Sequence, residues 1–416
     1  MTQNYNDKFP IKTETACTSK WTWSTIWLNK GQTSSCHRVD AVPLDPTNFA
    51  NFHNLPKKIQ DRELMLEGKW PTGGCEYCQK IEQVGGHSDR QHNNEIGGYI
   101  PIELATNPTA THVTPRIVEI FAQNTCNLAC IYCAEDLSSK IATENKKFGH
   151  LGDLIANVPT IGEERISADF NQFIIWLDAN IQGLSRLHLL GGETLIQHDL
   201  LEKVFEIIKR KPNPNLQLNI FSNFNTPEKY WYSYMNQLKD FCQSGHIGRL
   251  DLTCSIDCWS SAAEYVRSGL DLAKLETYLA WAADQSEDWL YLNINQTVSS
   301  MTIKTMPELI EKINQYSKKR HIGHYFMFVD GYKWQHPDVF DYSMWADDFD
   351  RILKVMPNDT IENKEAILRM VGLQKRLQNT CKENLIAQTK LRTYLNELDR
   401  RRGTDWKSIF PYLLPN

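Results

Sequence analysis

Short apolar runs and longer amphipathic runs alternate along the middle of the chain. Six apolar runs are too short for helices and rich in Ile, Leu, Val and Phe, and they predict buried strands at 116–122, 186–190, 216–221, 249–255, 289–298 and 324–329. Helical stretches lie between them, near 168–182, 199–211, 227–243, 271–284 and 304–318. This alternation predicts parallel βα units, either an α/β barrel or a doubly wound sheet. In both arrangements functional groups gather at the C-terminal ends of the strands.

The two ends of the chain have different patterns. The first 110 residues are rich in Asn, Thr, Pro and Gly, and they predict a hairpin from 21–29 to 32–36 and a helix over 55–66. The stretch 85–114 contains many Gly, Asn, His and Pro residues, which predicts a link to the α/β part. After position 340 the chain is charged and helical, over 364–376 and 384–402, which predicts a helical extension.

Composition narrows the class of protein. A net charge of −5 over 416 residues argues against a surface built mainly for nucleic acid. No apolar run approaches the roughly 20 residues that span a bilayer, and the N-terminus has no apolar signal core, so we expect a cytoplasmic protein. In a reducing compartment the 11 cysteines are expected to be thiols or metal ligands.

Three of these cysteines follow the first predicted strand of the α/β part. Cys126, Cys130 and Cys133 are separated by four and then three positions. Three thiolates on one loop can hold a [4Fe–4S] cluster and leave one iron without a protein ligand. Structural zinc usually takes four ligands in two closely spaced pairs, so this triplet fits zinc poorly. An open iron can bind and reduce a small molecule.

Polar residues follow the later predicted strands. A Gly-Gly-Glu turn ends the second, where two glycines allow close approach of a ligand and a carboxylate can receive an amine. Ser, Asn and Asp side chains at the next strand ends can bond hydroxyl groups. The alternative is that these groups only form turns and cap helices. The residues at these strand ends are Gly191, Gly192, Glu193, Ser222, Asn223, Ser255, Asp257 and Gln296, with the apolar Val298 beside the last.

A second set of cysteines precedes the predicted barrel. Cys17, Cys36, Cys75 and Cys78 provide four thiolates, enough to close a metal site, and this count leaves both zinc and an iron–sulfur cluster open. If Cys17 is only a core residue, a cluster here would keep an open iron. His37 is an alternative ligand or a hydrogen-bond donor beside one.

The triplet resembles a known signature. The pattern Cys-x-x-x-Cys-x-aromatic-Cys, with Tyr132 as the aromatic residue, resembles that of the radical S-adenosylmethionine (SAM) superfamily. The resemblance implies a partial (β/α)6 TIM-like barrel over 112–335. It also implies that the open iron chelates the amino and carboxylate groups of SAM. Reductive cleavage then yields a 5′-deoxyadenosyl radical, which abstracts a hydrogen from a substrate.

The resemblance also assigns cofactor contacts. Gly191, Gly192 and Glu193 would hold the methionyl amino group of SAM, and Arg267 would bind the methionyl carboxylate. Ribose contacts are assigned to Ser222, Asn223, Ser255 and Asp257. Gln296 and Val298 would face the adenine, and Tyr132 belongs to the cofactor contacts as part of the signature.

A second resemblance covers the N-terminal cysteines. The segments Gly-x-x-x-x-Cys-His at 31–37 and Gly-Lys-Trp-Pro-x-x-x-Cys-x-x-Cys at 68–78 are similar to the auxiliary-cluster module of twitch and SPASM radical enzymes. Here the module, over 1–100, would precede the barrel. Four cysteines imply one auxiliary [4Fe–4S] cluster. Such enzymes often act on peptides, which implies a peptide or amino-acid-derived substrate and a reductant such as flavodoxin or ferredoxin. The extension at 340–416 resembles no known module.

Three other functions stay open. One is a radical enzyme that acts on a nucleotide or RNA, which the acidic charge disfavours. Another is a zinc-stabilised interaction protein, and the last is a protein that keeps its cluster as a redox sensor. The sequence identifies no general base, because Glu119, Tyr132 and His188 all lie near strand ends, where burial is an equal explanation.

Overall fold

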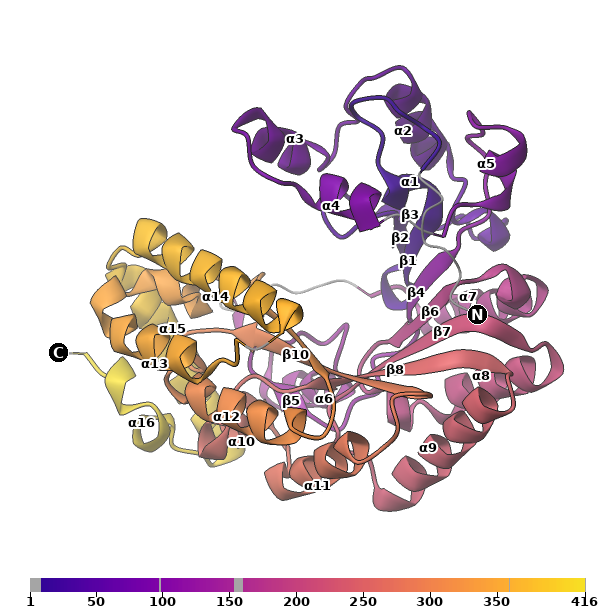
Figure 1. The fold of residues 1–416 in the computed structure, drawn as a ribbon. Coiled ribbons are helices and arrows are strands. Elements are labelled where there is room, and N and C mark those ends of the chain that lie inside the picture. The colour runs from indigo at the N-terminus through magenta and orange to yellow at the C-terminus, as the bar shows by residue number, and fades with distance from the viewer. Residues whose placement is uncertain (1–8, 97–98, 153–159, 359, 416) are drawn as a thin grey trace. The chain divides into compact units, whose positions relative to one another are not determined.

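The computed structural model describes residues 9–96, 99–152, 160–358 and 360–415 as a mixed α/β protein with a mostly parallel central sheet (Figure 1). Residues 1–8, in which the sequence predicts no signal peptide, lie outside this range. Over the described residues, no helix is long and apolar enough to cross a membrane. The contacts divide the chain into two units, one of Met1–Gln123, Pro159–Ile220 and Asn236–Leu250, the other of Asn124–Val158, Phe221–Met235 and Asp251–Asn416.

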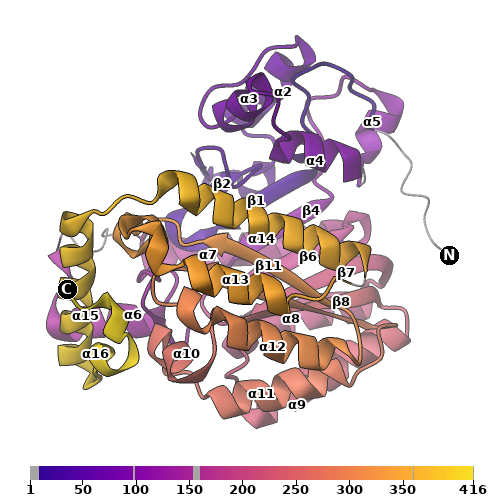
Figure 2. The same cartoon turned by 60° about the vertical axis from the view of Figure 1, so that its left-hand side comes forward.

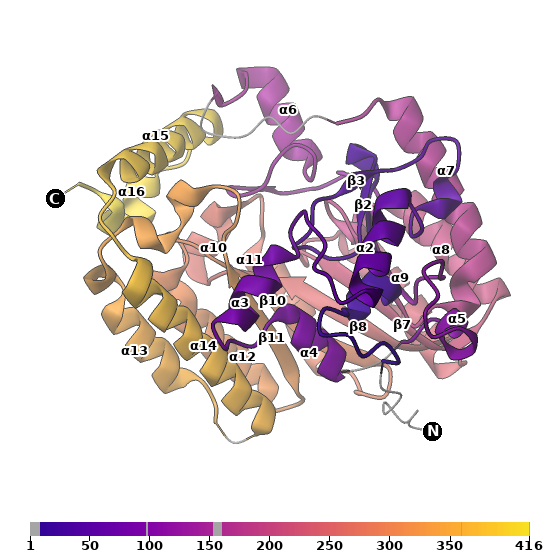
Figure 3. The same cartoon turned by 90° about the horizontal axis from the view of Figure 1, so that it is seen from above.

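The first unit contains the N-terminal strands and the beginning of the α/β part. Its strands are β1 (Trp23–Trp27), β2 (Gln32–Ser34), β3 (Val42–Pro43), β4 (Ile117–Phe121), β6 (Arg186–Leu190) and most of β7 (Asn213–Ser222). Its helices are α1 (Thr18–Thr22), α2 (Pro56–Leu66), α3 (Glu76–Gln83), α4 (Asp89–Ile96), α5 (Ile102–Thr106), α7 (Glu163–Asn180) and α8 (His198–Arg210). The amphipathic helices α7 and α8 lie side by side (Figure 3).

The second unit contains the remaining strands and helices of the described chain. Its strands are β5 (Ala129–Cys130), β9 (Arg267–Ser268), β10 (Leu290–Val298) and β11 (Ile322–Phe328), and β8 (Ile247–Ser255) begins in the first unit and ends here. Its helices are α6 (Ser139–Phe148), α10 (Ser260–Val266), α11 (Leu272–Ala283), α12 (Met306–Ser317), α13 (Ala346–Val355), α14 (Ile361–Thr380), α15 (Leu385–Arg402) and α16 (Trp406–Ile409), and α9 (Glu228–Gln243) is shared. Helices α12, α13 and α14 lie side by side (Figure 2).

Strand order follows chain order through the α/β part. Over the described residues the order is β11-β10-β8-β7-β6-β4-β1-β2-β3. The pairs β4–β6, β6–β7 and β10–β11 are parallel, as short apolar strands separated by helices require. All six predicted strands and the five predicted helices between them are confirmed, with shifts of a few residues at their ends. The barrel itself and the domain boundaries at 1–100, 112–335 and 340–416 stay predictions.

The N-terminal hairpin is confirmed, but it also joins the central sheet. Strand β1 pairs antiparallel with β2 and parallel with β4, where Trp23 lies opposite Ile117 and Trp27 opposite Phe121. Local sequence pattern predicts a hairpin, because a turn residue, Gly31, lies between its strands. It does not predict the pairing with β4, because that partner is distant in the chain.

The predicted link at 85–114 is instead partly helical. Helices α4 and α5 lie in it, and the polar residues that suggested a link make specific bonds. The Arg90 guanidinium donates to the Ala16 carbonyl at 2.8 Å, and the Asn94 side chain donates to the same carbonyl at 2.8 Å. The Asn94 amide oxygen also accepts from the Thr18 N–H at 2.8 Å. Helix α4 therefore anchors the turn that carries Cys17.

The C-terminal region is helical, as predicted. Helices α14 and α15 cover the predicted ranges 364–376 and 384–402, and α13 adds a helix that the sequence did not predict. Helix α15 ends at Gly403, whose φ of 69° places it in the left-handed region that suits glycine at a helix C-terminus.

Candidate functional site

The Asp257 carboxylate collects hydrogen bonds from three segments of the second unit. Tyr132, on the cysteine loop, donates its hydroxyl to Asp257 Oδ2 at 2.7 Å. The Arg267 guanidinium donates through Nε and Nη2 to the two carboxylate oxygens, each at 2.9 Å. The backbone N–H of Thr297, in β10, donates to Oδ1 at 2.8 Å. Asp257 is only 1% exposed, so this full set of donors replaces the water that the charge has lost.

Arg267 lies next to the cysteine loop through the backbone. Strands β5 and β9 form an antiparallel pair with Cys130 opposite Arg267, and the guanidinium Nη1 is 4.0 Å from Cys130 Sγ. The guanidinium carbon is 5.7 Å from the centroid of the Tyr132 ring. Burial alone would lower the pKa of Arg267, but Asp257 and Tyr132 raise it, so the cation persists. Burial also raises the pKa of Tyr132, which keeps its donating proton.

The three cysteines of the loop are neighbours. Burial raises the pKa of the Cys133 thiol, and Cys130 and Cys126 raise it further because their charges would repel a third thiolate. The Cys126 N–H donates to Ser139 Oγ at 3.0 Å, at the beginning of α6. Within the described ranges, no three Cys, His, Asp or Glu side chains are placed to coordinate one metal ion. Three thiols on one short loop are nevertheless the donor set that a [4Fe–4S] cluster takes.

The C-terminal helices support this loop. The Ile131 carbonyl, between Cys130 and Cys133, accepts from the Tyr394 hydroxyl of α15 at 2.7 Å and from the Gln335 side chain at 2.9 Å. Arg402, at the end of α15, pairs with Glu144 of α6 at 2.8 Å. The extension therefore fixes the backbone of the cysteine loop, a role that its sequence did not reveal.

The other predicted contacts of the second unit lie at strand ends. Asn223, after β7, donates to the Asn127 side chain of the cysteine loop at 2.8 Å, and the buried Ser222 hydroxyl accepts from the Phe224 N–H at 3.0 Å. Ser255 is half-buried at the end of β8.

Gln296 and Val298, in β10, are fully buried. The Gln296 side chain donates to the Asp257 carbonyl at 2.7 Å, and its oxygen lies 2.9 Å from His324 Nε2. Gln296 therefore links β10 and β11 to the turn that carries Asp257.

The Gly-Gly-Glu turn belongs to the first unit. Gly191 has a φ of 137°, and a Cβ there would lie 2.4 Å from the Gln123 carbonyl oxygen, which accepts from the Gly192 N–H at 2.9 Å. Glycine is thus required for the approach to the backbone just before the cysteine loop. The Glu193 carboxylate accepts from the Leu195 N–H at 3.1 Å and caps the following turn.

Gln197, beside this turn, was not identified from the sequence. Its side chain is 1% exposed, and neither its amide nitrogen nor its oxygen has a hydrogen-bond partner among the described residues. A buried amide without partners costs about 1–3 kcal/mol. A ligand that carries both donors and acceptors, as the amino-acid end of SAM does, would satisfy both atoms.

The four N-terminal cysteines all lie in the first unit and are electrostatic neighbours of one another in pairs. Cys17 and Cys75 share one hydrophobic cluster with Trp21. Burial raises the pKa of the Cys17 thiol to about 12, and Cys36 and Cys75 contribute to the increase. The pKa of Cys36 is raised by burial and by Cys78. Thiolate charges at these positions thus repel one another, which a metal cation would reverse.

A glycine forces two of these segments together. Gly74 has a φ of 112°, and a Cβ there would lie 2.1 Å from the Arg38 carbonyl oxygen. The segment after Cys36 therefore packs directly on the residue before Cys75. Four thiols suit either a [4Fe–4S] cluster or zinc.

His37 bonds a carboxylate in this structure. Its Nε2 is 2.8 Å from the carboxylate of Glu119, which also accepts from the Thr25 hydroxyl at 2.7 Å. Burial would raise the pKa of Glu119, but His37 lowers it. His188 lies opposite Glu119 in β6; burial lowers its pKa to about 4, and its Nε2 has no partner within the described chain.

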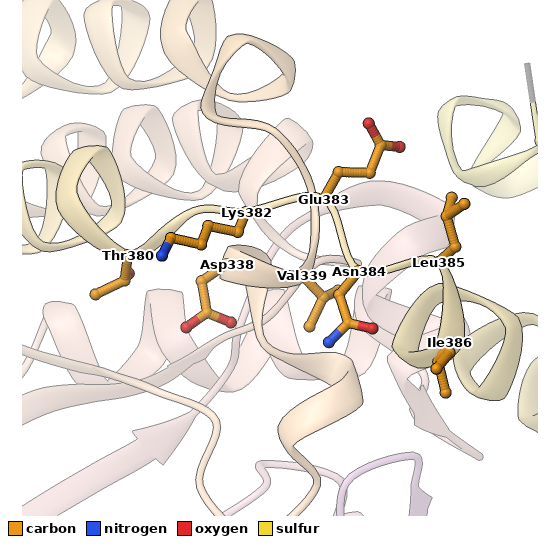
Figure 4. Close-up of a pocket in the computed structure, with 8 residues that line it drawn as sticks. All are labelled: Asp338, Val339, Thr380, Lys382, Glu383, Asn384, Leu385 and Ile386. Atoms are coloured by element: carbon orange, nitrogen blue, oxygen red, sulfur yellow. The ribbon is translucent and has the colours of Figure 1, made fainter.

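One surface recess lies away from these residues. It has a volume of about 550 Å3 and is formed at the junction of α14 and α15 (Figure 4). Leu385 and Ile386 lie at one end of it, and Asp338 and Lys382 lie toward the other. None of the predicted site residues lines it, so its size does not mark it as the site of the chemistry.

Comparisons with known proteins add little. No protein-family model matches the sequence, and no curated protein matches it. Among solved structures, the chain is similar to the crystal structure of Streptococcus suis SuiB bound to S-adenosylmethionine, with 14% sequence identity and a TM-score of 0.36. The alignment covers 79% of this chain and 67% of that chain. This similarity is too weak to identify a fold or a function.

The Asp257–Arg267 pair yields a stability prediction. Asp257→Asn leaves the buried Arg267 without its counter-charge. We therefore expect the free energy of unfolding to fall by about 3–5 kcal/mol, and the thermal midpoint measured by circular dichroism to drop clearly. The matched control is Asp199→Asn, which breaks the largely exposed pair with Lys203 (2.8 Å). Asp199→Asn should lower the free energy of unfolding by less than about 1 kcal/mol. Equal effects of the two substitutions would contradict the buried ion pair.

The packing of Gly74 yields a second prediction. Gly74→Ala forces the segment after Cys36 away from Cys75. We therefore expect the free energy of unfolding to fall by about 2 kcal/mol or more, and less metal to be bound per chain. Gly68→Ala is the control, because Gly68 has a similar left-handed φ of 73° but nothing within 4 Å of its Cβ position. Gly68→Ala should lower the free energy of unfolding by only about 1 kcal/mol and leave the metal content unchanged. Thermal unfolding and metal analysis of both variants decide the matter.

Proposed function

We propose that this chain is a radical SAM enzyme. It would cleave S-adenosylmethionine reductively, and the resulting 5′-deoxyadenosyl radical would abstract a hydrogen from a bound substrate. The observation that carries the proposal is the bonded group of Asp257 and Arg267 with Tyr132 of the three-cysteine loop. A structural zinc site has no need of a buried ion pair beside its ligands.

The residues of the second unit have complementary roles in this proposal. Cys126, Cys130 and Cys133 hold a [4Fe–4S] cluster, which supplies the electron for cleavage when it is bound. Arg267 offers a fixed cation for the carboxylate of SAM, since its Nη1 is not used on Asp257. Asp257 holds Arg267 and Tyr132 in place, and the resemblance also assigns it a contact to the ribose. Ser222, Asn223, Ser255, Gln296 and Val298 complete the proposed nucleoside contacts.

The first unit supplies the remaining contacts. Gly191, Gly192 and Glu193, with the unpartnered Gln197, are proposed to bind the amino end of SAM. Cys17, Cys36, Cys75 and Cys78 are proposed to hold one auxiliary [4Fe–4S] cluster in a twitch-like module that precedes a partial (β/α)6 barrel. His37 is paired with Glu119, which favours a supporting role over ligation.

We further propose a peptide or amino-acid-derived substrate, a flavodoxin or ferredoxin as the electron donor, and a cytoplasmic location. These proposals rest on the resemblance of the cysteine motifs. The competing function is a zinc-stabilised interaction protein. That function predicts no iron, and it requires neither Arg267 nor Gln197.

Iron and sulfide analysis tests the proposal. Protein purified and reconstituted without oxygen should contain about eight irons and eight sulfides per chain. Replacing Cys126, Cys130 and Cys133 together by Ala should leave about four of each and abolish the release of 5′-deoxyadenosine from SAM. The control is Cys381→Ala, outside both cysteine sets, which should change neither result. Stoichiometric zinc in place of iron, with no cleavage of SAM, would show the enzyme proposal to be wrong.

A further inference from the structure

An excess of buried positive charge lies in the part of the first unit that carries the N-terminal cysteines. Lys20, Lys58 and Arg62 are 3%, 4% and 0% exposed, and Asp61, at 5%, is the carboxylate buried among them. Charged side chains are rarely buried unless they are paired. The described residues thus leave this part of the first unit with more cations than anions.

The partners of each cation confirm the imbalance. Lys20 Nζ is 2.6 Å from the Asp61 carboxylate, which the more exposed Lys57 also contacts. Lys58 Nζ donates to two hydroxyls, that of Thr33 at 2.8 Å and that of Ser24 at 3.1 Å.

Arg62 is bonded only to neutral oxygens. Its guanidinium donates to the Lys20 and His53 carbonyls, each at 2.8 Å, and to the Thr111 carbonyl and the Asn54 amide oxygen. Among the described residues, Asp61 is thus the buried carboxylate near these three cations, and the partly buried Glu103 also acts on Arg62.

An uncompensated buried ammonium is costly. Burial lowers the pKa of Lys58, and the neighbouring charges of Arg62 and Lys20 lower it further. Burial likewise lowers the pKa of Arg62 to about 9. An anionic group bound nearby would remove this cost.

Of these cations, Lys20 lies beside the cysteine set. Burial opposes the charge of Lys20, but Cys75, Asp61 and Cys17 raise its pKa, so both thiols are electrostatic neighbours of this ammonium. A small cavity of about 50 Å3 is lined by Lys20, Lys58 and Ser35, among others. Ser35 directly precedes Cys36, and its buried hydroxyl has no partner among the described residues. The cavity thus brings together the ammonium groups of Lys20, Lys57 and Lys58, the carboxylates of Asp40 and Asp61, and an unused donor beside Cys36.

We propose that Lys20 and Lys58 are the counter-charges of an anionic cluster held by Cys17, Cys36, Cys75 and Cys78, and that they raise its reduction potential. This inference rests on the auxiliary cluster of the proposed function. Four thiolates around a [4Fe–4S] core carry about two net negative charges, and reduction adds another. A fixed cation stabilises the reduced form more than the oxidised form, so it makes the cluster easier to reduce.

The experiment uses the full-length chain with Cys126, Cys130 and Cys133 replaced by Ala, so that only the auxiliary cluster remains. In this background Lys58→Met and Lys20→Met remove one charge each at similar side-chain volume. Each variant should keep about four irons and show a reduced-to-oxidised ratio about tenfold lower at a fixed potential, which is 59 mV for one electron. The readout is a redox titration followed by electron paramagnetic resonance.

Two controls separate charge from packing. Lys57→Met removes a neighbouring, partly exposed ammonium and should leave the potential unchanged. Lys58→Arg keeps the charge and should restore most of the potential that Lys58→Met loses. A potential that is the same in Lys58→Met, Lys20→Met and Lys57→Met would overturn the inference. Zinc at these cysteines would also overturn it, whereas the SAM reaction of the unmodified chain would report independently on the proposed enzyme.

Discussion

The second unit is organised around one buried ion pair, between Asp257 and Arg267. A carboxylate that is 1% exposed is tolerated because a guanidinium, a phenol and a backbone N–H all donate to it. The donors come from the cysteine loop, β9 and β10, so the requirement to satisfy one charge fixes three segments. Each segment also carries a side chain with a proposed role at the cofactor. Charge satisfaction and site geometry are therefore the same constraint here.

Both cysteine sets are accompanied by a buried cation. Arg267 Nη1 lies 4.0 Å from Cys130 Sγ, and Lys20 is an electrostatic neighbour of Cys17 and Cys75. Burial raises the pKa of the Cys130, Cys17 and Cys75 thiols, while the nearby cation lowers it. Metal binding requires thiolates, and a fixed positive charge reduces the cost of forming them. In both cysteine sets, a buried cation therefore favours the thiolate form of the neighbouring cysteines.

The sequence predicts the regular part of the fold well and the tertiary contacts poorly. Strands such as β6 were located within a residue because a short apolar run between amphipathic helices has few other interpretations. The parallel pairing of β1 with β4 was missed, because no local pattern records a distant partner. Helix α4 was missed because its residues are polar, and its stability comes from bonds that Arg90 and Asn94 make to the turn before Cys17.

The candidate site shows the same division. Cysteine spacing selected Cys126 and strand-end position selected Asp257, whereas Arg267 was selected from the family resemblance. The family resemblance assigned separate ligand contacts to Asp257 and Arg267, and the structure pairs these two side chains with each other. No sequence pattern marked Gln197 or Tyr394 as part of a site, since a lone Gln or Tyr in a helical region is common. Only the unsatisfied amide of one and the loop contact of the other distinguish them.

The central claim is that the cysteine triplet holds a cluster with an iron open to SAM. The most direct test is the electron paramagnetic resonance spectrum of the reduced protein with and without SAM. The account predicts that SAM shifts the signal, and that the shift disappears when Cys126, Cys130 and Cys133 are replaced by Ala. A cluster signal that SAM leaves unchanged would contradict it.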